Sequence, residues 1–432
     1  MILVRAMKAA LAAMSIAGAL SGACGGGSPQ ISAGTGGHGA TGTGGAGASG
    51  GGGAGAAGGQ AGAGGGTTDA ADAMPGDGGG SDLPGSDTSD GGPPDLAPGP
   101  PGTWSPIPRS GGAWPPADEY AALVYDSARD VLVLLAAPQD PNLPLDLWEF
   151  ALATSTWKNR YPSPAPAYWP RSRLAFSVAY DSRRGRTFLF GGVYAANFDD
   201  LWEWDGTSGT WMALTPNPRP PSWPLNRYAA GLGYDNDRGR LVLFGGVGLH
   251  PQVLAYLLHD DLWEWDAGAG AWTDRTPDPR PAAWPAARQS FSMVYDPDRK
   301  RFVVFGGDAG TSPDITEMRL ADLWEWDGGA ATWQQRAATP TAVWPTARMP
   351  AATAYLAGRG SLFVYGGFRI QADLWEWSIT TSTWTNRTPS PPTAWPTGRG
   401  SAGVAFVPAR NRVFLFGGSR LNDFWSWQPP DP

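Results

Sequence analysis

The chain repeats one tryptophan-rich motif six times, and this repetition limits what it can fold into. Four full copies of Asp-Leu-Trp-Glu-Trp begin at Asp200, Asp261, Asp322 and Asp373, and the variants DLWEF and DFWSW begin at Asp146 and Asp423. An apolar run precedes each copy, and one further Trp and then a Trp-Pro pair follow most of them. A repeat of this kind, 50 to 61 residues long, indicates an array of similar supersecondary units.

Each unit contains four short runs that predict β-strands, here called a to d. In the second unit these are residues 174–180, 186–190, 201–204 and a run centred on Trp211. The a–b and c–d connections, DSRRG and DGTSG, have the Asp, Ser and Gly residues of tight hairpins. Six units of four antiparallel strands predict an all-β, six-bladed propeller. A β-solenoid is the alternative, but short strands joined by hairpins do not coil in one direction.

The apolar runs and the motif resemble a known repeat. Five of the six runs end in Gly-Gly, at Gly192, Gly246, Gly307, Gly367 and Gly418, whereas the first ends in Ala136-Ala137. With the tryptophans, this pattern resembles the kelch repeat and, more loosely, the central domain of galactose oxidase, over residues 103–427. The resemblance implies a propeller that binds partners on the face formed by the b–c and d–a loops.

The two ends of the repeat array complement each other. The last unit ends at Trp427 without a fourth-strand Trp, whereas Trp104 precedes the first Trp-Pro pair without parent strands. We expect Trp104 to provide strand d of the sixth blade. An N-terminal strand would then close the ring and leave no open sheet edge.

The N-terminal quarter has a different composition. Residues 1–23 have Arg5 and Lys8, then an apolar run and small residues, which is typical of an export signal and too short to span a bilayer. Cys24, the only cysteine, follows this signal. The arrangement resembles the lipobox of bacterial lipoproteins, although Ser21 stands where that pattern has a Leu-type residue. An ordinary secretory signal with an incidental Cys is the alternative.

Residues 24–102 predict a tether. From Gly25 to Gly102 there are 31 glycines and no aromatic, Lys or Arg residue, so this stretch cannot bury enough apolar surface to fold. We expect a disordered linker between the anchor and the propeller, with residues 428–432 as a C-terminal tail. Because Gly25 and not Asp follows Cys24, the lipoprotein resemblance implies the outer membrane or cell surface of a diderm bacterium.

Five arginines recur four residues after the Trp-Pro tryptophan, and they allow two interpretations. They are Arg173, Arg227, Arg288, Arg348 and Arg399. In the structural interpretation, which we favour, each pairs with the motif Glu of the preceding blade, 23 or 24 residues upstream, and the leftover pair is Ser426 with Asp118. In the functional interpretation the arginines ring the channel mouth and hold an acidic ligand. The Trp-Pro pairs could likewise stack on sugars, but their presence in every blade favours packing.

Two b–c loops of 14 residues, Val247–Asp260 and Asp308–Ala321, lie in neighbouring blades, and length variation on a constant scaffold marks a functional face. His250 and His259 in the first loop could bind a metal, but solvated histidines are the better interpretation. Asp308, Asp314 and Glu317 in the second loop, with Asp322, could collect calcium, but their spacing does not resemble an EF-hand. We expect neither a metal nor a cofactor.

These features predict an exported, lipid-anchored propeller that binds or scaffolds a protein or glycan at the cell envelope. A carbohydrate-active oxidase, lyase or isomerase using the same loops is the alternative, and the scarcity of His, Cys and clustered acids argues against it. After residue 102 the chain has 29 basic and 32 acidic residues, so nothing in its charge favours nucleic acid. We expect a monomer whose membrane attachment is the lipid on Cys24 alone.

Overall fold

The structure, a computed structural model, describes residues 102–431 except 110–111, 119, 139, 141, 163–165, 167, 311–317, 338–342, 368–370 and 391–393. Cys24, the expected signal peptide and the expected tether lie outside the described residues. Within the described part, no helix has the length and apolarity needed to cross a membrane.

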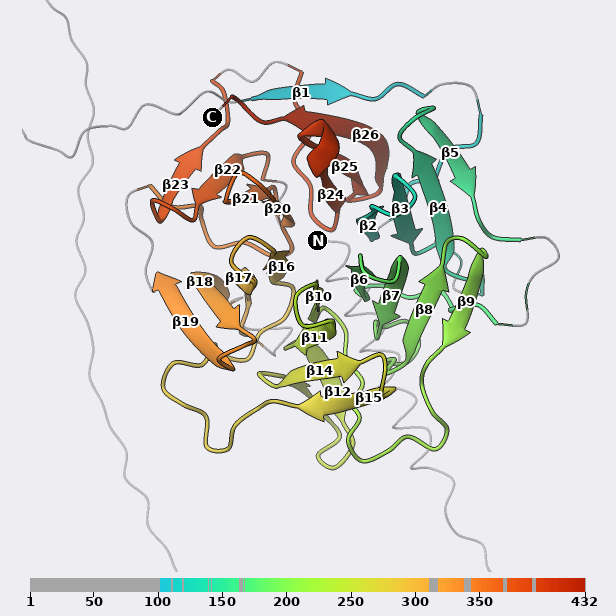
Figure 1. The fold of residues 1–432 in the computed structure, drawn as a ribbon, viewed down its shortest axis with the longest axis vertical. Coiled ribbons are helices and arrows are strands. Elements are labelled where there is room, and N and C mark those ends of the chain that lie inside the picture. Colours follow the sequence, from blue (N-terminus) through green and yellow to red (C-terminus); the bar gives the residue numbers. More distant parts are fainter. Residues whose placement is uncertain are drawn as a thin grey trace, which may run out of the picture. The chain divides into compact units, whose positions relative to one another are not determined.

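Six four-stranded antiparallel sheets are arranged around a central axis (Figure 1). Blades 1 and 2 consist of β2 (Ala121–Asp126), β3 (Val131–Ala136), β4 (Asp146–Ala151) and β5 (Thr156–Asn159), then β6 (Ser177–Asp181), β7 (Arg186–Phe190), β8 (Leu201–Asp205) and β9 (Thr210–Ala213). Blades 3 and 4 consist of β10 (Gly231–Asp235), β11 (Arg240–Phe244), β14 (Leu262–Asp266) and β15 (Ala271–Asp274), then β16 (Ser292–Asp296), β17 (Arg301–Asp308), β18 (Arg319–Asp327) and β19 (Thr332–Ala337). Blade 5 consists of β20 (Ala352–Leu356), β21 (Ser361–Tyr365), β22 (Leu374–Ser378) and β23 (Thr383–Asn386).

Blade 6 joins the two ends of the propeller. It contains β24 (Gly403–Val407), β25 (Arg412–Gly418) and β26 (Leu421–Gln428), and its fourth strand is β1 (Thr103–Pro106) from the other end. Trp104 of β1 pairs with Trp427 of β26. The all-β, six-bladed propeller closed by an N-terminal strand is therefore confirmed. A short 3₁₀ turn, Pro408–Arg410, replaces the usual a–b turn in this blade.

The hydrophobic core lies between the blades. Six clusters of buried side chains each join two neighbouring sheets, for example Phe188 and Phe190 of blade 2 with Leu241 and Leu243 of blade 3. The buried residues of β7 and β11 form continuous apolar runs because both faces of these strands are covered. Burial of apolar area thus holds neighbouring blades together, and a few main-chain hydrogen bonds between blades, such as Gly192 to Arg227, add to it.

The Trp-Pro tryptophans tie each blade to the one before it. In all six, the indole Nε1–H donates to the backbone carbonyl of the residue that precedes the repeated motif in the preceding blade. The pairs are Trp114 with Asn422, Trp169 with Leu145, Trp223 with Asp199, Trp284 with Asp260, Trp344 with Ala321 and Trp395 with Ala372, at 2.6 to 2.8 Å. The packing interpretation of these tryptophans is thus confirmed.

Candidate functional site

The a–b and c–d turns emerge at one end of the propeller, and the b–c and d–a connections at the other, which we call the loop face. Eight large hydrophobic side chains are exposed among the described residues. Seven of them lie in b–c or d–a connections: Leu143, Tyr168, Val253, Leu254, Leu257, Met318 and Val343. Exposed apolar side chains gathered on one face are typical of a binding surface.

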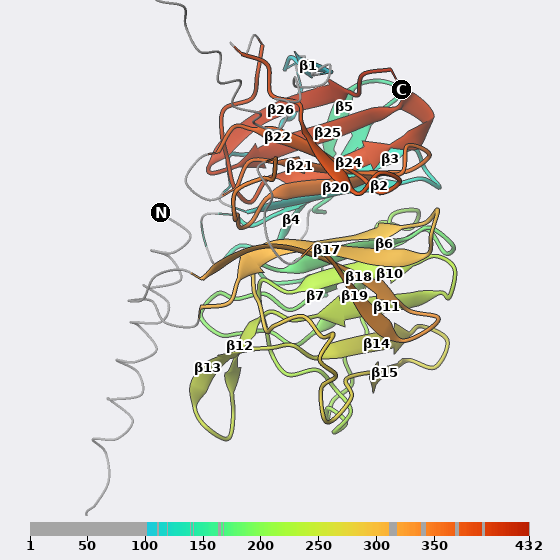
Figure 2. The ribbon, with the colours of Figure 1, turned by 90° about the vertical axis from the view of Figure 1, so that its left-hand side faces the viewer.

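The long b–c loop of blade 3 is an ordered hairpin. It consists of β12 (Val247–His250) and β13 (Ala255–Leu258), and it stands away from the four strands of its blade (Figure 2). Val247 is buried in a small cluster with Val193 and Tyr228, so the base of the hairpin is fixed to blade 2 as well. The tip is exposed, with Leu254 at 78%. The hairpin is therefore an ordered projection with exposed apolar side chains at its tip.

The two candidate histidines belong to this hairpin. His250 ends β12 and His259 follows β13. The Nδ1 atom of His250 and the Nε2 atom of His259 are buried without a hydrogen-bond partner. Burial lowers the pKa of His259 to about 4, and the charge of Arg227 acts in the same direction. Both side chains are half-buried, so they are less exposed than the solvated histidines that we expected.

Only part of the second long b–c loop lies within the described residues. Strands β17 and β18 extend into it, and Asp308 lies opposite Arg319 in their antiparallel register. The Asp308 carboxylate accepts a hydrogen bond from the backbone N–H of Gly310. Asp314 and Glu317 lie outside the described residues. Among the described residues, no group of three or more His, Cys, Asp and Glu side chains is placed to hold a metal ion.

The arginine after each Trp-Pro pair forms a clamp at the loop face within its own blade. In blade 4, Arg288 donates to both carboxylate oxygens of Asp322, each at 2.8 Å, and to the carbonyl of Gly306 at 3.0 Å. Its Nε–H donates to the carbonyl of Ala286 at 3.1 Å. The indole of Trp324 also donates to Asp322, at 2.7 Å. One guanidinium thus joins the starts of strands a and c to the end of strand b.

The same clamp occurs in blades 2 to 6. The pairs are Arg173–Asp200, Arg227–Asp261, Arg288–Asp322, Arg348–Asp373 and Arg399–Asp423. All five arginines are at most 2% exposed, so they do not line an open channel mouth. The arginines therefore have a structural role, although not with the partner that we predicted.

The predicted pairing of these arginines with the motif Glu of the preceding blade is wrong. Strand c runs from the loop face toward the opposite end, so the Glu lies about 10 Å beyond the Asp three residues before it. The Glu instead contacts arginines of its own blade, as Glu264 does with Arg238 of the a–b turn at 2.5 Å and with Arg275, which follows β15, at 2.9 Å.

The Gly-Gly pair completes the clamp. Gly191 has a φ of +64°, and a Cβ there would lie 2.4 Å from the carbonyl oxygen of Arg227 in the next blade. Gly192 donates its N–H to that same carbonyl at 2.9 Å. The arginine therefore ties its own blade with its side chain and the preceding blade with its backbone.

Blade 1 lacks every part of this clamp except the aspartate. Asp118 occupies the arginine position, Ala136 and Ala137 replace the glycines, and Asp146 is the motif Asp. Asp118 is only 3% exposed, and its Oδ2 atom has no hydrogen-bond partner. The indole Nε1 of Trp148, which in the other blades donates to the motif Asp, is buried without a partner too.

The two carboxyls of blade 1 have perturbed pKa values. Burial, together with the charge of Asp146, raises the pKa of Asp118 to about 7, and burial raises that of Asp146 to about 6. In blade 3 burial also raises the pKa of Asp261, but the charge and hydrogen bonds of Arg227 outweigh it and hold the pKa at about 2. In the sequence, Asp118 stands out only as the exception to the five arginines at this repeat position. Comparing the arginine position across the repeats with the motif Asp would have found the pair.

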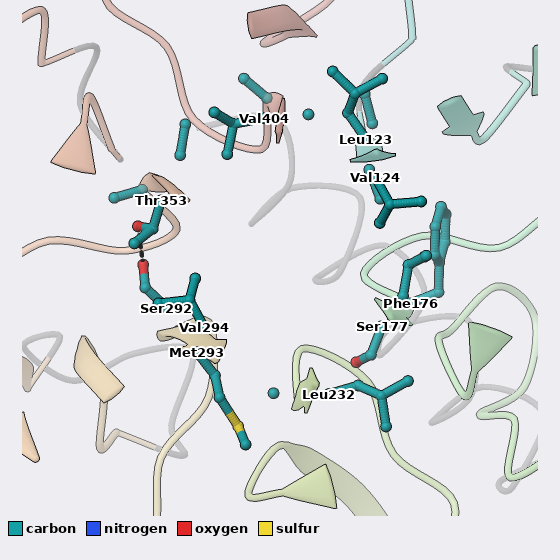
Figure 3. Close-up of a pocket in the computed structure, with 18 of the residues that line it drawn as sticks. Leu123, Val124, Phe176, Ser177, Leu232, Ser292, Met293, Val294, Thr353 and Val404 are labelled. Atoms are coloured by element: carbon teal, nitrogen blue, oxygen red, sulfur yellow. Dashed lines mark hydrogen bonds between the residues drawn. The ribbon is translucent and has the colours of Figure 1, made fainter. Parts of the chain in front are cut away.

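The centre of the propeller holds a small cavity. A cavity of about 180 Å³ is lined by the innermost strands of all six blades, including Leu123, Val124, Leu232 and Val404 (Figure 3). Its polar contacts include one between Ser292 and Thr353, whose hydroxyls are 2.6 Å apart. The perturbed carboxyls thus belong to the loop face and not to this lining.

Comparison with known proteins agrees with this geometry. The model of the KLHDC2/KLHL20/DRC7 Kelch-repeats domain matches residues 238–430. Over this part of the chain the propeller is similar to kelch-repeat domains. The chain is 22% identical over 316 residues to Mei4-dependent protein 6 of Schizosaccharomyces pombe, covering 65% of this chain and 43% of that protein. It is 24% identical over 260 residues to Kelch domain-containing protein 10 of Xenopus tropicalis, covering 57% of each. The chain thus spans about half the length of these curated relatives. Kelch propellers are a family of protein-interaction modules.

Proposed function

We propose that this kelch-type propeller binds a protein partner on its loop face and that hairpin β12–β13 is the main anchor. The exposed side chains of the hairpin carry the proposal. Val253, Leu254 and Leu257 are 59%, 78% and 39% exposed on an ordered projection. Burial of about 25 cal/mol per Å² of apolar surface makes such side chains the natural centre of an interface.

Exposed apolar side chains beyond the hairpin support the proposal. Leu143, Tyr168, Met318 and Val343 lie in other b–c or d–a connections and are 50%, 71%, 61% and 38% exposed. The loop face therefore offers apolar area around the hairpin as well as on it.

We further propose that the propeller is displayed at the cell envelope of a diderm bacterium through a lipid on Cys24. The support is the export-type segment that precedes this lone cysteine. Radiolabelled fatty acid should be incorporated into the wild-type chain and not into a Cys24→Ser variant. Equal labelling of both chains would contradict the anchor while leaving the binding proposal intact.

Binding is tested by capture from an array of envelope proteins, with a glycan array run in parallel. The loop-face variant carries Val253→Ser, Leu254→Ser and Leu257→Ser. The matched control is Met212→Ser, because Met212 is 53% exposed on the outer strand β9, away from the loop face. We expect the triple variant to lose the partner at least about tenfold and the control to keep it. Unchanged binding by the triple variant, or capture of glycans alone, would contradict the proposal.

A further inference from the structure

We propose that the partner completes blade 1: an arginine side chain of the bound protein lies between Asp118 and Asp146 and plays the part that a resident arginine plays in the other five blades. This inference rests on the proposed function, since it names a chemical feature of the partner that the loop face would bind.

The five other blades show which chemical group the motif aspartate binds. Asp146 is the sixth copy of an aspartate that in each sibling blade holds a guanidinium by both carboxylate oxygens. Among the described residues, Asp146 has no ion pair. Its position in the repeat is thus that of a guanidinium acceptor whose guanidinium is absent from its own blade.

The side chains around Asp146 increase the demand for a cation. Asp118 adds a second carboxyl, and its buried Oδ2 atom has no partner. Burial raises the pKa of Asp118, and the nearby charge of Asp146 acts in the same direction. A buried carboxylate without a partner is unfavourable unless it gains a proton or a cation. At neutral pH the pair therefore favours a bound cation.

The acceptor groups at this position favour arginine over a metal ion. Two side-chain carboxyls are too few for calcium, which takes six to eight oxygen ligands. A guanidinium has five N–H donors in a planar fork, which suits two carboxyls at once. In the sibling blades the aspartate side chain keeps 14 to 39% exposure, so the acceptor is reached from solvent.

Two exposed apolar side chains, here called the rim, lie on the segment that leads into Asp146 and on the segment hydrogen-bonded to it. Leu143, three residues before Asp146, is 50% exposed, and Tyr168 in the next d–a connection is 71% exposed. Backbone hydrogen bonds join the two segments: Leu145 donates to Pro170 and Ser172 donates to Leu143. This rim offers contact to the methylene stem of an incoming arginine.

The test uses NMR of the full chain labelled with ¹⁵N in its Trp side chains. The indole N–H of Trp148 lies next to the site in sequence and has no partner, so it reports occupancy. It is assigned by Trp148→Phe. The probes are N-acetyl-arginine amide, N-acetyl-lysine amide and CaCl₂.

We expect the arginine amide to shift the Trp148 resonance saturably and the lysine amide to bind at least about tenfold more weakly. The shift should vanish in Asp118→Arg, which places a guanidinium in the blade itself, and in Asp146→Asn, which keeps the shape of the site. It should persist in the triple hairpin variant, so a failure of the hairpin proposal is distinguishable from a failure here. No saturable shift, a shift unchanged in Asp146→Asn, or a stronger response to CaCl₂ would overturn the proposal.

Discussion

Blade 1 and blade 4 have the same four strands and the same motif aspartate, but opposite electrostatics at the loop face. In blade 4 the guanidinium of Arg288 neutralises Asp322 and satisfies two main-chain carbonyls. In blade 1 a second carboxyl, Asp118, takes the place of the arginine, and a carboxyl oxygen and an indole N–H are left without partners. The repeat therefore uses the arginine to stabilise five blades and omits it in one.

The difference shows how a repeat architecture separates stability from function. Five clamps and six interblade tryptophan hydrogen bonds hold the ring, so one blade can lose its clamp without opening it. Buried groups that stay unsatisfied lower stability, and they persist where binding makes use of them. Substitutions in the clamp of different blades, and in the interblade tryptophans, test this separation.

The largest effect is expected from removing a resident guanidinium. Arg288→Met keeps most of the side-chain length but leaves Asp322 and the carbonyl of Gly306 without their donors. Breaking a buried ion pair in this way costs about 3–5 kcal/mol of unfolding free energy. Denaturant titration measures it. A loss below about 1 kcal/mol would mean that the clamp does not hold the blade.

In blade 1 we expect replacement of the buried carboxyl to raise the unfolding free energy, by an amount that depends on pH. The pKa of Asp118 is about 7 in the fold and ordinary when unfolded, so its contribution to stability is complete below about pH 4 and is lost as the pH rises toward 7. Asp118→Asn removes this loss. The variant should be more stable than wild type by about 2–4 kcal/mol at pH 8 and nearly equal at pH 4. Equal stability at both pH values would show that the carboxyl is not perturbed.

The glycine of the clamp gives a third comparison. Gly191→Ala forces a Cβ into the left-handed region and against the carbonyl of Arg227. We expect a loss of about 2–3 kcal/mol in thermal or denaturant unfolding. Blade 1 provides the control, because Ala136 already stands there and Ala136→Gly should change stability by less than about 1 kcal/mol. Similar effects in both blades would contradict the difference in backbone geometry.

The smallest effect is expected from the interblade tryptophans. Trp169→Phe removes the N–H that donates to Leu145 at 2.7 Å, whereas Trp157→Phe removes an N–H that has no partner. The two variants lose similar volume, so their difference isolates the hydrogen bond. Trp169→Phe should cost about 1 kcal/mol more. An equal cost would mean that these indoles act by packing alone.

The sequence was sufficient for the fold because the repeat, the turns and the seam at Trp104 all favour one topology. It also predicted which face is variable, from the lengths of the b–c loops. The salt-bridge partners could not be obtained from spacing alone, since each arginine lies between the motif of the preceding blade and that of its own blade, and each motif offers both an Asp and a Glu. Only their placement on strand c separates them, with the Asp at the loop face.

Other features depend on packing that spacing does not reveal. The hairpin β12–β13 was expected only as a long loop, because nothing in its sequence shows that Val247 is buried against blade 2. Asp118 is visible in the sequence as the one repeat position without arginine. Its meaning depends on knowing that the arginine binds the motif Asp, which in blade 1 is Asp146.

The titration of the Asp118 carboxyl tests the difference between blade 1 and its siblings most directly. Asp side chains labelled with ¹³C, with Asp118→Asn used for assignment, give the pKa of this group by NMR. The account predicts a value of about 7, well above the ordinary value of 3.8. A value near 4 would contradict it, because blade 1 would then already satisfy its carboxyls and would have no need of a cation from a partner.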